Sequence, residues 1–503
     1  MDRVKIGWGK REISIDEPVS IPGQMYLRIS EGIHDPLYVT ALCVDGGKGQ
    51  DAVIFCSCDI VVLRGGLIDA TKEKVAQLRP EIPVENIVMG ATHTHSAVAA
   101  NATPEKSPDG QEIYSGLKYR AFFVQMCAEA ICEAWDNRCE GGMTYGYGYA
   151  VVAHSRRVCY DVDMSTIKEN KFAPNGHAIM YGDTADEHFS HYEAGADHFV
   201  NLMYTFDKDN KLTGIVVNVP CPSQLSERFR KLSADFWNEV REEVAMEYGR
   251  DVYVLPQCAA AGDLSPRVMH YKQTQARRMA LKYDLPYDPA QAKAMNQHEY
   301  NKVMGERRDI GQRIMSAIRE VYSWASKDIQ TELTVCYETV PLALSRRMIS
   351  DAEKEGCEQI IAQVDATVLD PADYTPEKYR TLVSRQNALK NRQKGALERY
   401  ATQNEEPTIA SKACVVRIGD IAFATTRFEL YMDYMHRVQA RSPFIQTFVV
   451  QLAGDENGRY LPTQRGKDNK GYSASIFCNS VGPEGGQEWV EAVLTSLDKM
   501  AQK

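Results

Sequence analysis

The chain has 503 residues, of which 44% are apolar and 25% charged, and its formal net charge is −10. This composition is that of an ordinary globular protein and excludes a disordered or fibrous one. The acidic balance argues against a nucleic-acid partner, and no apolar run approaches the roughly 20 residues of a membrane-spanning helix. Thirteen cysteines without a repeating spacing favour free thiols in a reducing compartment. We therefore expect a cytoplasmic protein without stable membrane anchoring.

The first half of the chain predicts alternating strands and helices. Residues 51–63 and 87–91 read as buried strands, and residues 66–78 between them read as a helix. A strand, a helix and a second strand most economically form a parallel, right-handed crossover. Further buried strands are expected around 412–426 and 444–452. The expected fold class is α/β, with mixed, largely parallel sheets flanked by helices.

Two histidines directly follow the strand at 87–91. The motif ATHTHS at 91–96 places His93 and His95 two residues apart, and alternate side chains of an extended chain share a face. Open α/β sheets form their ligand crevices at the carboxyl ends of strands, and imidazole is the commonest metal ligand of intermediate softness. The pair therefore indicates a metal or catalytic site. The alternative is two strand-end histidines that bond to the backbone.

Two other predicted strands also end in reactive side chains. The strand at 214–220 runs into Cys221, and the strand at 251–257 runs into the loop CAAAGDLSPR, which carries Asp263 and Ser265. Because the carboxyl ends of parallel strands meet at one edge of a sheet, we expect these side chains to share a crevice with the two histidines.

Two neighbouring arginines are a further candidate for the site. Arg156 and Arg157 follow an alternating, strand-like segment. A guanidinium group binds a carboxylate, a phosphate or a developing oxyanion. The alternative is a pair of arginines on the protein surface.

Residues 268–400 are rich in charge and show helical periodicity, and 306–325 should pack a single face onto the main body. We expect 268–400 to be a mainly helical insertion within one catalytic domain spanning 1–503.

Several separate motifs together resemble one protein family. They are GWGKREIS and GIHDPLYVTALCVDGG near the start, ATHTHS at 91–96, GDLSP at 262–266, and RIGDIAF followed by FE at 417–429. In this order they resemble the N-terminal catalytic domain of the neutral/alkaline non-lysosomal ceramidases, over roughly Gly7 to Val481. The resemblance implies the fold of that domain and the activity of a zinc-dependent amidase. We expect the chain to lack the family's C-terminal β-sandwich domain.

The resemblance also implies a zinc site. By order along the chain, His93 takes the place of the family's first zinc-binding histidine, Glu429 that of its carboxylate and Tyr460 that of its tyrosine. Cys221 stands where the family has its second zinc-binding histidine. A thiolate is a good zinc ligand, so this set of four is chemically reasonable. A shift of register at Cys221 would leave three ligands or an inactive site.

Four further residues resemble groups near the family's substrate. His95 resembles the family's active-site histidine and Arg156 its substrate-side arginine. Tyr472 resembles a second tyrosine near the substrate, and Ser265 resembles the serine that the family needs for activity. On this basis His95 is expected to pass a proton to the leaving amine, and Arg156 with Tyr472 to stabilise the oxyanion. Ser265 is either a nucleophile or a residue that orients the water.

Three functions are compatible with the sequence. The first is zinc-dependent hydrolysis of an amide (N-acyl) bond in a soluble small molecule, because an acidic chain without a membrane-facing module is poorly suited to extracting a lipid. The second is zinc-dependent hydrolysis of an ester, a lactone or another small anionic substrate, which Arg156 and Arg267 favour. The third is a non-catalytic, metal-stabilised binding protein, suggested by Cys221 in place of histidine. The sequence assigns no oligomeric state.

Overall fold

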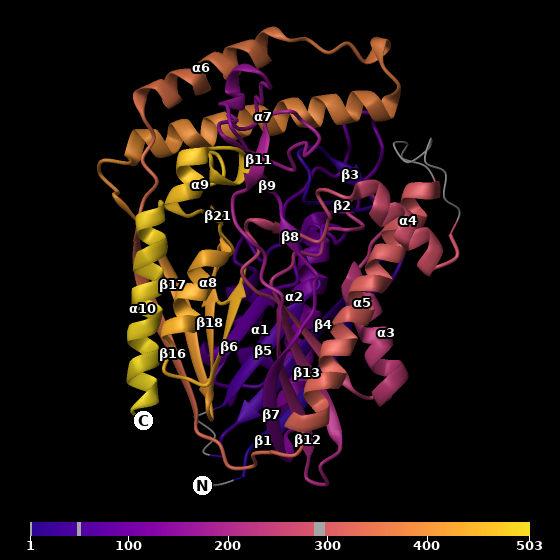
Figure 1. Cartoon of the computed structure of the whole chain (residues 1–503), viewed down its shortest axis with the longest axis vertical. Coiled ribbons are helices and arrows are strands. Elements are labelled where there is room, and N and C mark those ends of the chain that lie inside the picture. The colour runs from indigo at the N-terminus through magenta and orange to yellow at the C-terminus, as the bar shows by residue number, and fades with distance from the viewer. Residues whose placement is uncertain (1–2, 48–51, 286–296) are drawn as a thin grey trace.

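Two β-sheets lie face to face in the middle of the molecule, and helices cover both outer faces (Figure 1). A computed structural model describes residues 3–47, 52–285 and 297–503. Helix, sheet, sheet and helix follow one another as four layers. The predicted α/β class is therefore confirmed. Each of the two sheets forms one side of the core that lies between them.

The larger sheet has eight strands. In order across the sheet they are β14 (Tyr253–Cys258), β13 (Leu212–Val219), β12 (Phe199–Asp207), β7 (Cys139–Tyr149), β1 (Lys5–Glu12), β4 (Tyr38–Asp45), β5 (Val53–Cys58) and β6 (Ile87–Ala91). Only the outermost pairs, β13 with β14 and β5 with β6, are parallel. The other neighbours are antiparallel. The prediction of largely parallel sheets is therefore wrong.

Connection length explains this difference. Short turns join antiparallel strands, as the turn from Asp207 to Leu212 joins β12 and β13, whereas a parallel pair needs a longer crossover. Helix α1 (Leu67–Leu78) supplies that crossover between β5 and β6, so the predicted strand-helix-strand unit is confirmed.

The smaller sheet has four strands, in the order β16 (Val335–Ser345), β17 (Thr408–Ile418), β18 (Ile421–Thr426) and β20 (Gln446–Gln451). β17 and β18 form a hairpin whose turn contains Gly419 at a φ of 58°. This left-handed conformation is one that glycine adopts readily. β18 and β20 are parallel, so the carboxyl end of β18 lies beside that of its neighbour.

Strand residues alternate between two cores. In β5, Phe55 points into the core between the sheets, where its ring lies 4.8 Å from that of Phe423 on the smaller sheet. Its neighbours Cys56 and Cys58 point the other way, into the core beneath helix α2 (Gly116–Asp136). This period of two is what a strand buried on both faces requires. Each buried phenyl ring contributes about 2–3 kcal/mol relative to an exposed one.

The helices fall into three groups. The outer face of the larger sheet is covered by α1, α2, α3 (Phe236–Tyr248) and α5 (Gln297–Ala325), with α4 (Lys272–Lys282) against α5. The smaller sheet is covered by α8 (Met432–Arg441) and α10 (Pro483–Ala501). α6 (Asp351–Ala366) and α7 (Pro376–Thr402) lie across the top of the molecule in Figure 1, near α9 (Gln464–Asn469). Within the described ranges, no helix is both long and apolar enough to cross a bilayer.

Residues 268–400 contain α4 to α7 and also strand β16, which the helical prediction did not include. Residues 286–296 of this segment lie outside the described residues. The predicted single packed face of 306–325 is confirmed, because Ile310, Ile314 and Ile318 are all buried. That this segment is an insertion, and that 1–503 forms one domain, stay predictions.

Short strands and single helical turns cluster at the end of the sheets that carries the candidate site. The strands are β2 (Ser20–Ile21), β3 (Arg28–Ile29), β8 (His154–Ser155), β9 (Arg157–Tyr160), β10 (Ala178–Met180), β11 (Phe189–Tyr192), β15 (Leu264–Ser265), β19 (Glu429–Leu430) and β21 (Tyr460–Leu461). The turns include η4 (Tyr472–Ala474). Glu429 lies in β19, and helix α8 begins three residues later, at Met432.

Candidate active site

Four segments that leave carboxyl ends of strands meet at one edge of the sheets. His93 follows β6, Gln224 follows β13, Gly262 follows β14, and Glu429 follows β18. Each of these strands belongs to a parallel pair, which is why their ends reach the same edge. Gly262 permits the close approach: a Cβ at this position would lie 2.4 Å from the backbone oxygen of Glu429.

The two predicted histidines face each other. The Nε2 atoms of His93 and His95 are 3.3 Å apart, and the rings are nearly perpendicular. His93 has a φ of 60°, so the rings converge through a left-handed turn after β6 and not through strand alternation. A non-glycine residue in this region is uncommon and strained, and such residues concentrate at functional sites.

The hydrogen-bond partner of His93 fixes its tautomer. Its Nδ1 lies 2.7 Å from the backbone oxygen of Val61, which can only accept, so Nδ1 carries the hydrogen. In the neutral ring, Nε2 then carries a lone pair and no hydrogen. The Nε2 atom lies 3.3 Å from Oε2 of Glu429. A histidine held in this way by a backbone carbonyl is typical of a metal ligand.

Glu429 and Tyr460 are neighbours by strand pairing. They are directly opposed in the parallel pair of β19 and β21, which brings their side chains together. Burial opposes ionisation of Glu429, but a proton on Nε2 of His93, together with Arg156 and the Tyr460 hydroxyl, lowers its pKa to about 2. The carboxylate is therefore ionised at neutral pH when a positive charge lies between it and the ring of His93.

His95 is held from both ends. Its Nδ1 lies 3.1 Å from Glu227, and the side-chain amide of Gln224 donates to its Nε2 over 2.9 Å. Burial, outweighing the neighbouring Glu227, lowers the pKa of His95. Arg267 in turn pairs with Glu227 at 2.5 Å and donates to the backbone oxygen of Gln224. These contacts orient a neutral imidazole whose Nε2 can accept a proton. Gly23 faces the ring so closely that a Cβ there would lie 2.7 Å from it.

Arg156 connects the remaining groups. Its guanidinium donates to Tyr460, Tyr181, Gln224 and the backbone oxygen of Gly262, and it lies 3.8 Å from Glu429. Only 1% of Arg156 is exposed, so the alternative of a surface arginine pair is wrong. Its neighbour Arg157 is also buried and pairs with Glu193, away from the histidines.

The structure does not bring Cys221 to this cluster. Its thiol lies 3.4 Å from the backbone oxygen of Val152. Among the described residues, the only group of three or more His, Cys, Asp or Glu donors within 4.8 Å of one another is Cys56, Cys58 and Cys127. The chain turns after β13, so the side chain that reaches His95 comes from Gln224, three residues further on.

Ser265 and Tyr472 occupy different positions relative to the histidines. Ser265 is fully buried, and its hydroxyl accepts the backbone N–H of Arg267. Tyr472 lines the same cavity as His95, with its ring 6.1 Å from that of Tyr460. Burial raises the pKa of Tyr472, so its hydroxyl stays protonated, and Arg392 of α7 donates to it. The helices at the top of the molecule thus contribute directly to the surroundings of the site.

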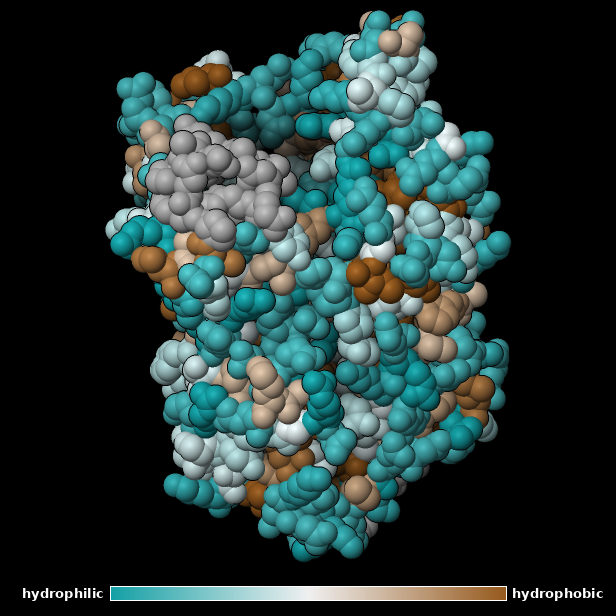
Figure 2. Space-filling view, turned by 90° about the vertical axis from the view of Figure 1, so that its right-hand side faces the viewer, coloured by the Kyte–Doolittle hydropathy of each residue, from teal (hydrophilic) through white to brown (hydrophobic). Residues whose placement is uncertain are grey.

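A cavity of about 1210 Å³ opens beside these residues and is lined by His95, Arg156, Gln224, Tyr460 and Tyr472 among others. Figure 2 shows a hollow with a largely hydrophilic rim in the upper part of the face that carries α4 and α5. The basic side chains that line the cavity are Arg28, Arg156, Arg228, Arg230, Arg267, Lys272, Lys302 and Arg380, and the acidic ones are Glu227, Glu306 and Glu377.

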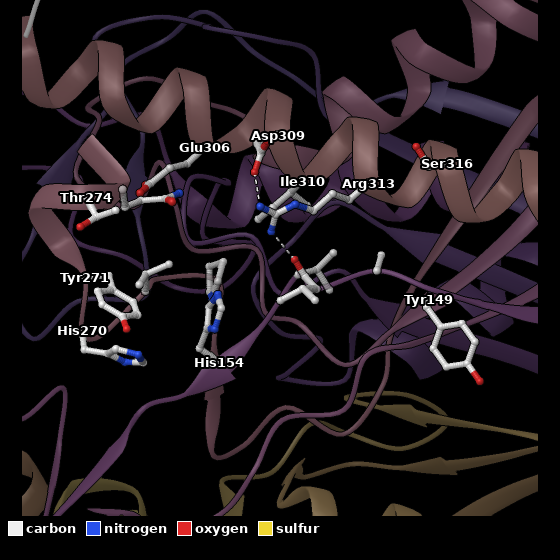
Figure 3. Close-up of a pocket in the computed structure, with 16 residues that line it drawn as sticks. Tyr149, His154, His270, Tyr271, Thr274, Glu306, Asp309, Ile310, Arg313 and Ser316 are labelled. Atoms are coloured by element: carbon white, nitrogen blue, oxygen red, sulfur yellow. Dashed lines mark hydrogen bonds and ion pairs between the residues drawn. The ribbon is translucent and has the colours of Figure 1, made fainter. Parts of the chain in front are cut away.

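A second cavity, of about 680 Å³, lies next to the first between α5 and the segment 149–154 (Figure 3). Val268 and Glu306 line both cavities. Arg313, in the centre of Figure 3, pairs with Asp309 and donates to the backbone oxygen of Val151. None of the residues predicted from the sequence to form the site lines this cavity, so the larger cavity is the candidate active site.

The donors beside the larger cavity could hold a metal ion. Nε2 of His93 lies 3.3 Å from Nε2 of His95 and 3.3 Å from Oε2 of Glu429, and in the neutral tautomers no ring hydrogen lies between them. Donors that bind one zinc ion tetrahedrally, each at 2.0–2.1 Å, lie about 3.3 Å apart. His93 and Glu429 therefore have the spacing of two ligands of one divalent cation. The thiols of Cys56, Cys58 and Cys127 form a separate candidate metal group.

Sequence reasoning missed three residues of this cluster: Gln224, Glu227 and Tyr181. Gln224 and Glu227 lie three and six residues beyond Cys221, in the same strand-end loop, so the loop was predicted but the wrong side chain was chosen. Polar residues that follow a buried strand were the available signal. Tyr181 had none, because it reaches Gln224 from a segment that reads only as a polar loop.

Comparisons with known proteins agree with this architecture. No family model and no curated protein sequence matches the chain. Among solved structures, the fold is similar to neutral ceramidase from Pseudomonas aeruginosa, with a TM-score of 0.64 and 15% identity over 99% of this chain and 75% of that one. A ceramidase complexed with C2 gives a TM-score of 0.62 and 15% identity over 100% of this chain and 76% of that one. The resemblance inferred from the motifs is thus confirmed at the level of the fold.

Proposed function

We propose that this chain is a zinc-dependent hydrolase that cleaves an amide bond in a small-molecule substrate. The observation that carries the proposal is the surroundings of Nε2 of His93, which lies 3.3 Å from Nε2 of His95 and 3.3 Å from the Glu429 carboxylate beside a large cavity. Such an arrangement is stable only with a cation or an added proton between the acceptors. The similarity in fold to neutral ceramidases supports an amide as the scissile bond.

The ligand set proposed here is His93, Glu429 and Tyr460. Cys221 is left out, because its thiol turns to the backbone of Val152. When bound, a zinc ion supplies a Lewis acid for the scissile carbonyl and lowers the pKa of a water molecule to about 7. The backbone carbonyl of Val61 accepts the Nδ1 hydrogen of His93, which keeps the Nε2 lone pair available to the metal.

The remaining residues position the substrate and move a proton. His95, held at Nδ1 by Glu227, offers Nε2 toward the cavity to take up a proton and deliver it to the leaving amine. Arg156 and Tyr472 line the cavity as hydrogen-bond donors for the developing oxyanion. We assign Ser265 no covalent step, since its hydroxyl accepts the Arg267 N–H and helps to hold the loop that carries Arg267.

The test is hydrolysis of matched N-acyl amides and O-acyl esters by zinc-loaded protein, with zinc content measured in parallel. Wild type is expected to bind about one zinc ion per chain at this site and to cleave amides, and His93→Ala to lose both properties. Cys127→Ser is the matched control, because it removes a buried ligand from the other candidate metal group.

Each other outcome contradicts the proposal in a distinct way. Turnover of esters but not amides would favour the second function expected from the sequence. Tight zinc that stabilises the fold without any hydrolysis would favour a metal-stabilised binding protein. Folded wild type that takes up no zinc at His93 would defeat the metal site itself.

A further inference from the structure

The charged side chains that line the larger cavity are mainly basic, although the chain as a whole is acidic. The whole sequence has more acidic than basic residues, 68 against 58, yet the described residues that line this cavity include eight basic side chains against three acidic ones. Charges of one sign inside a cleft with low-dielectric walls focus the field and raise the local concentration of counter-ions. A cavity of this kind selects for anions.

The basic side chains differ in how far they are already neutralised. Arg380 pairs with Asp109 at 2.9 Å and Arg230 with Glu31 at 3.1 Å, so both serve the structure of the cavity wall. Lys272, at the start of α4, is exposed and has no acidic partner within the part of the chain that the structure describes.

Lys302 is also incompletely compensated. The ammonium group of Lys302 lies 3.8 Å from Glu306, and burial raises the pKa of Glu306, which favours the neutral form of that carboxyl. Arg267 pairs with Glu227 at 2.5 Å, but 27% of its side chain stays exposed, so it can offer further N–H donors to a ligand beside His95. The uncompensated positive charge therefore lies on Lys272 and Lys302, along α4 and α5.

We propose that the substrate is an anionic amide, with a carboxylate a few bonds from the scissile bond, bound by Arg267, Lys272 and Lys302. This inference rests on the function proposed above and specifies its substrate class. A purely apolar amide would displace water from these cations without offering them a partner, which is unfavourable. A carboxylate would form charge-assisted hydrogen bonds with them.

The experiment varies charge at nearly constant size. N-acetyl-L-glutamate, N-acetyl-L-glutamine and N-acetyl-L-glutaminamide carry two, one and no negative charges, respectively. At low salt we expect kcat/KM to fall about tenfold with each charge removed, and the differences to shrink as ionic strength rises. Equal values for the three compounds, or a preference for the neutral one, would overturn the inference.

Variants assign the preference to named residues. Lys272→Gln combined with Lys302→Gln should reduce the ratio of kcat/KM for N-acetyl-L-glutamate over N-acetyl-L-glutaminamide by about tenfold. Arg277→Gln is the matched control, since Arg277 is exposed on the same helix α4 and does not line the cavity. An effect of the same size in the control would mean that long-range charge, and not the cavity, sets the preference.

A binding measurement separates this inference from the proposed function. Calorimetric titration of N-acetyl-L-glutamate into metal-free wild type needs no turnover and should give salt-sensitive binding that the double variant loses. Binding with this pattern but no hydrolysis would contradict the proposed function alone. Hydrolysis of amides regardless of charge, with no salt-sensitive binding, would contradict only the anionic substrate.

Discussion

Two groups of side chains that could bind a metal ion lie on or after neighbouring strands, and their surroundings differ. His93, His95 and Glu429 lie beside a cavity, where each donor has a second partner that fixes its orientation or charge. Cys56 and Cys58 point instead into the core beneath α2, and their sulfur atoms lie 3.9 Å apart. The first group lies beside a cavity, and the second is enclosed by the core.

The environment of the thiols explains this difference. Burial raises the pKa of Cys127 well above its usual value, whereas hydrogen bonds from Cys127 and Cys58 lower the pKa of Cys56 to about 5, so at most one of the three thiols is ionised. At the cavity, by contrast, Glu429 stays ionised because a histidine and an arginine compensate its burial. Proximity of donor atoms is thus common to both groups, while compensation of charge distinguishes the candidate active site.

The most direct test of the difference between the two groups removes one donor from each. Glu429→Gln keeps the size of the side chain but removes the charge that faces His93, and we expect kcat/KM to fall by about 10³-fold or more, equivalent to about 4 kcal/mol. Cys58→Ser should leave kcat/KM within about threefold, since its group holds no predicted catalytic residue.

Steady-state kinetics and zinc content, measured on both variants, check this expectation. If Cys58→Ser lost zinc and activity while Glu429→Gln kept them, the assignment of the two groups would have to be reversed. Thermal unfolding of both proteins controls for loss of the fold.

Local features of the fold could be predicted from the sequence. The strand at Ile87–Ala91 has the bounds that its apolar run indicated, and the helix expected at 66–78 is α1. Both depend on residues close together in the chain. The direction of most strands was predicted wrongly, because it depends on which distant segments pair, such as β1 between β4 and β7.

The candidate site shows the same division. The two histidines could be predicted to meet because one short motif carries both, and Glu429 could be placed beside them from the order of the family's motifs. Gln224 could not be distinguished from Cys221, because the path of the loop after β13 decides which side chain faces His95. That path is set by contacts with segments far away in sequence, such as Val152.

A smaller effect on kcat is expected when the negative charge beside His95 is removed. Glu227→Gln removes the charge at Nδ1 and allows the amide to stabilise the wrong tautomer, so we expect kcat to fall about 10²-fold with a smaller change in KM. Glu227→Asp, which keeps the charge, should recover part of the loss. Comparable losses in both variants would indicate that the length of the side chain, and not its charge, is what matters.

The smallest predicted effect concerns stability and compares a buried carboxyl near the site with the buried thiols. Burial raises the pKa of Asp263 from 3.8 to about 6, and its carboxyl accepts the backbone N–H of Met432. Between these values the folded state binds more protons than the unfolded one, so this group's contribution is complete below about pH 4 and is lost as pH rises through about 6. We expect Asp263→Asn, which keeps the acceptor, to remove a pH-dependent loss of about 1–2 kcal/mol over this range. Urea unfolding of wild type and variant at several pH values measures it. Cys43→Ser should leave the slope unchanged, because burial raises the pKa of the Cys43 thiol to about 12 and it is neutral throughout this range; equal slopes in wild type and Asp263→Asn would contradict the assignment to Asp263.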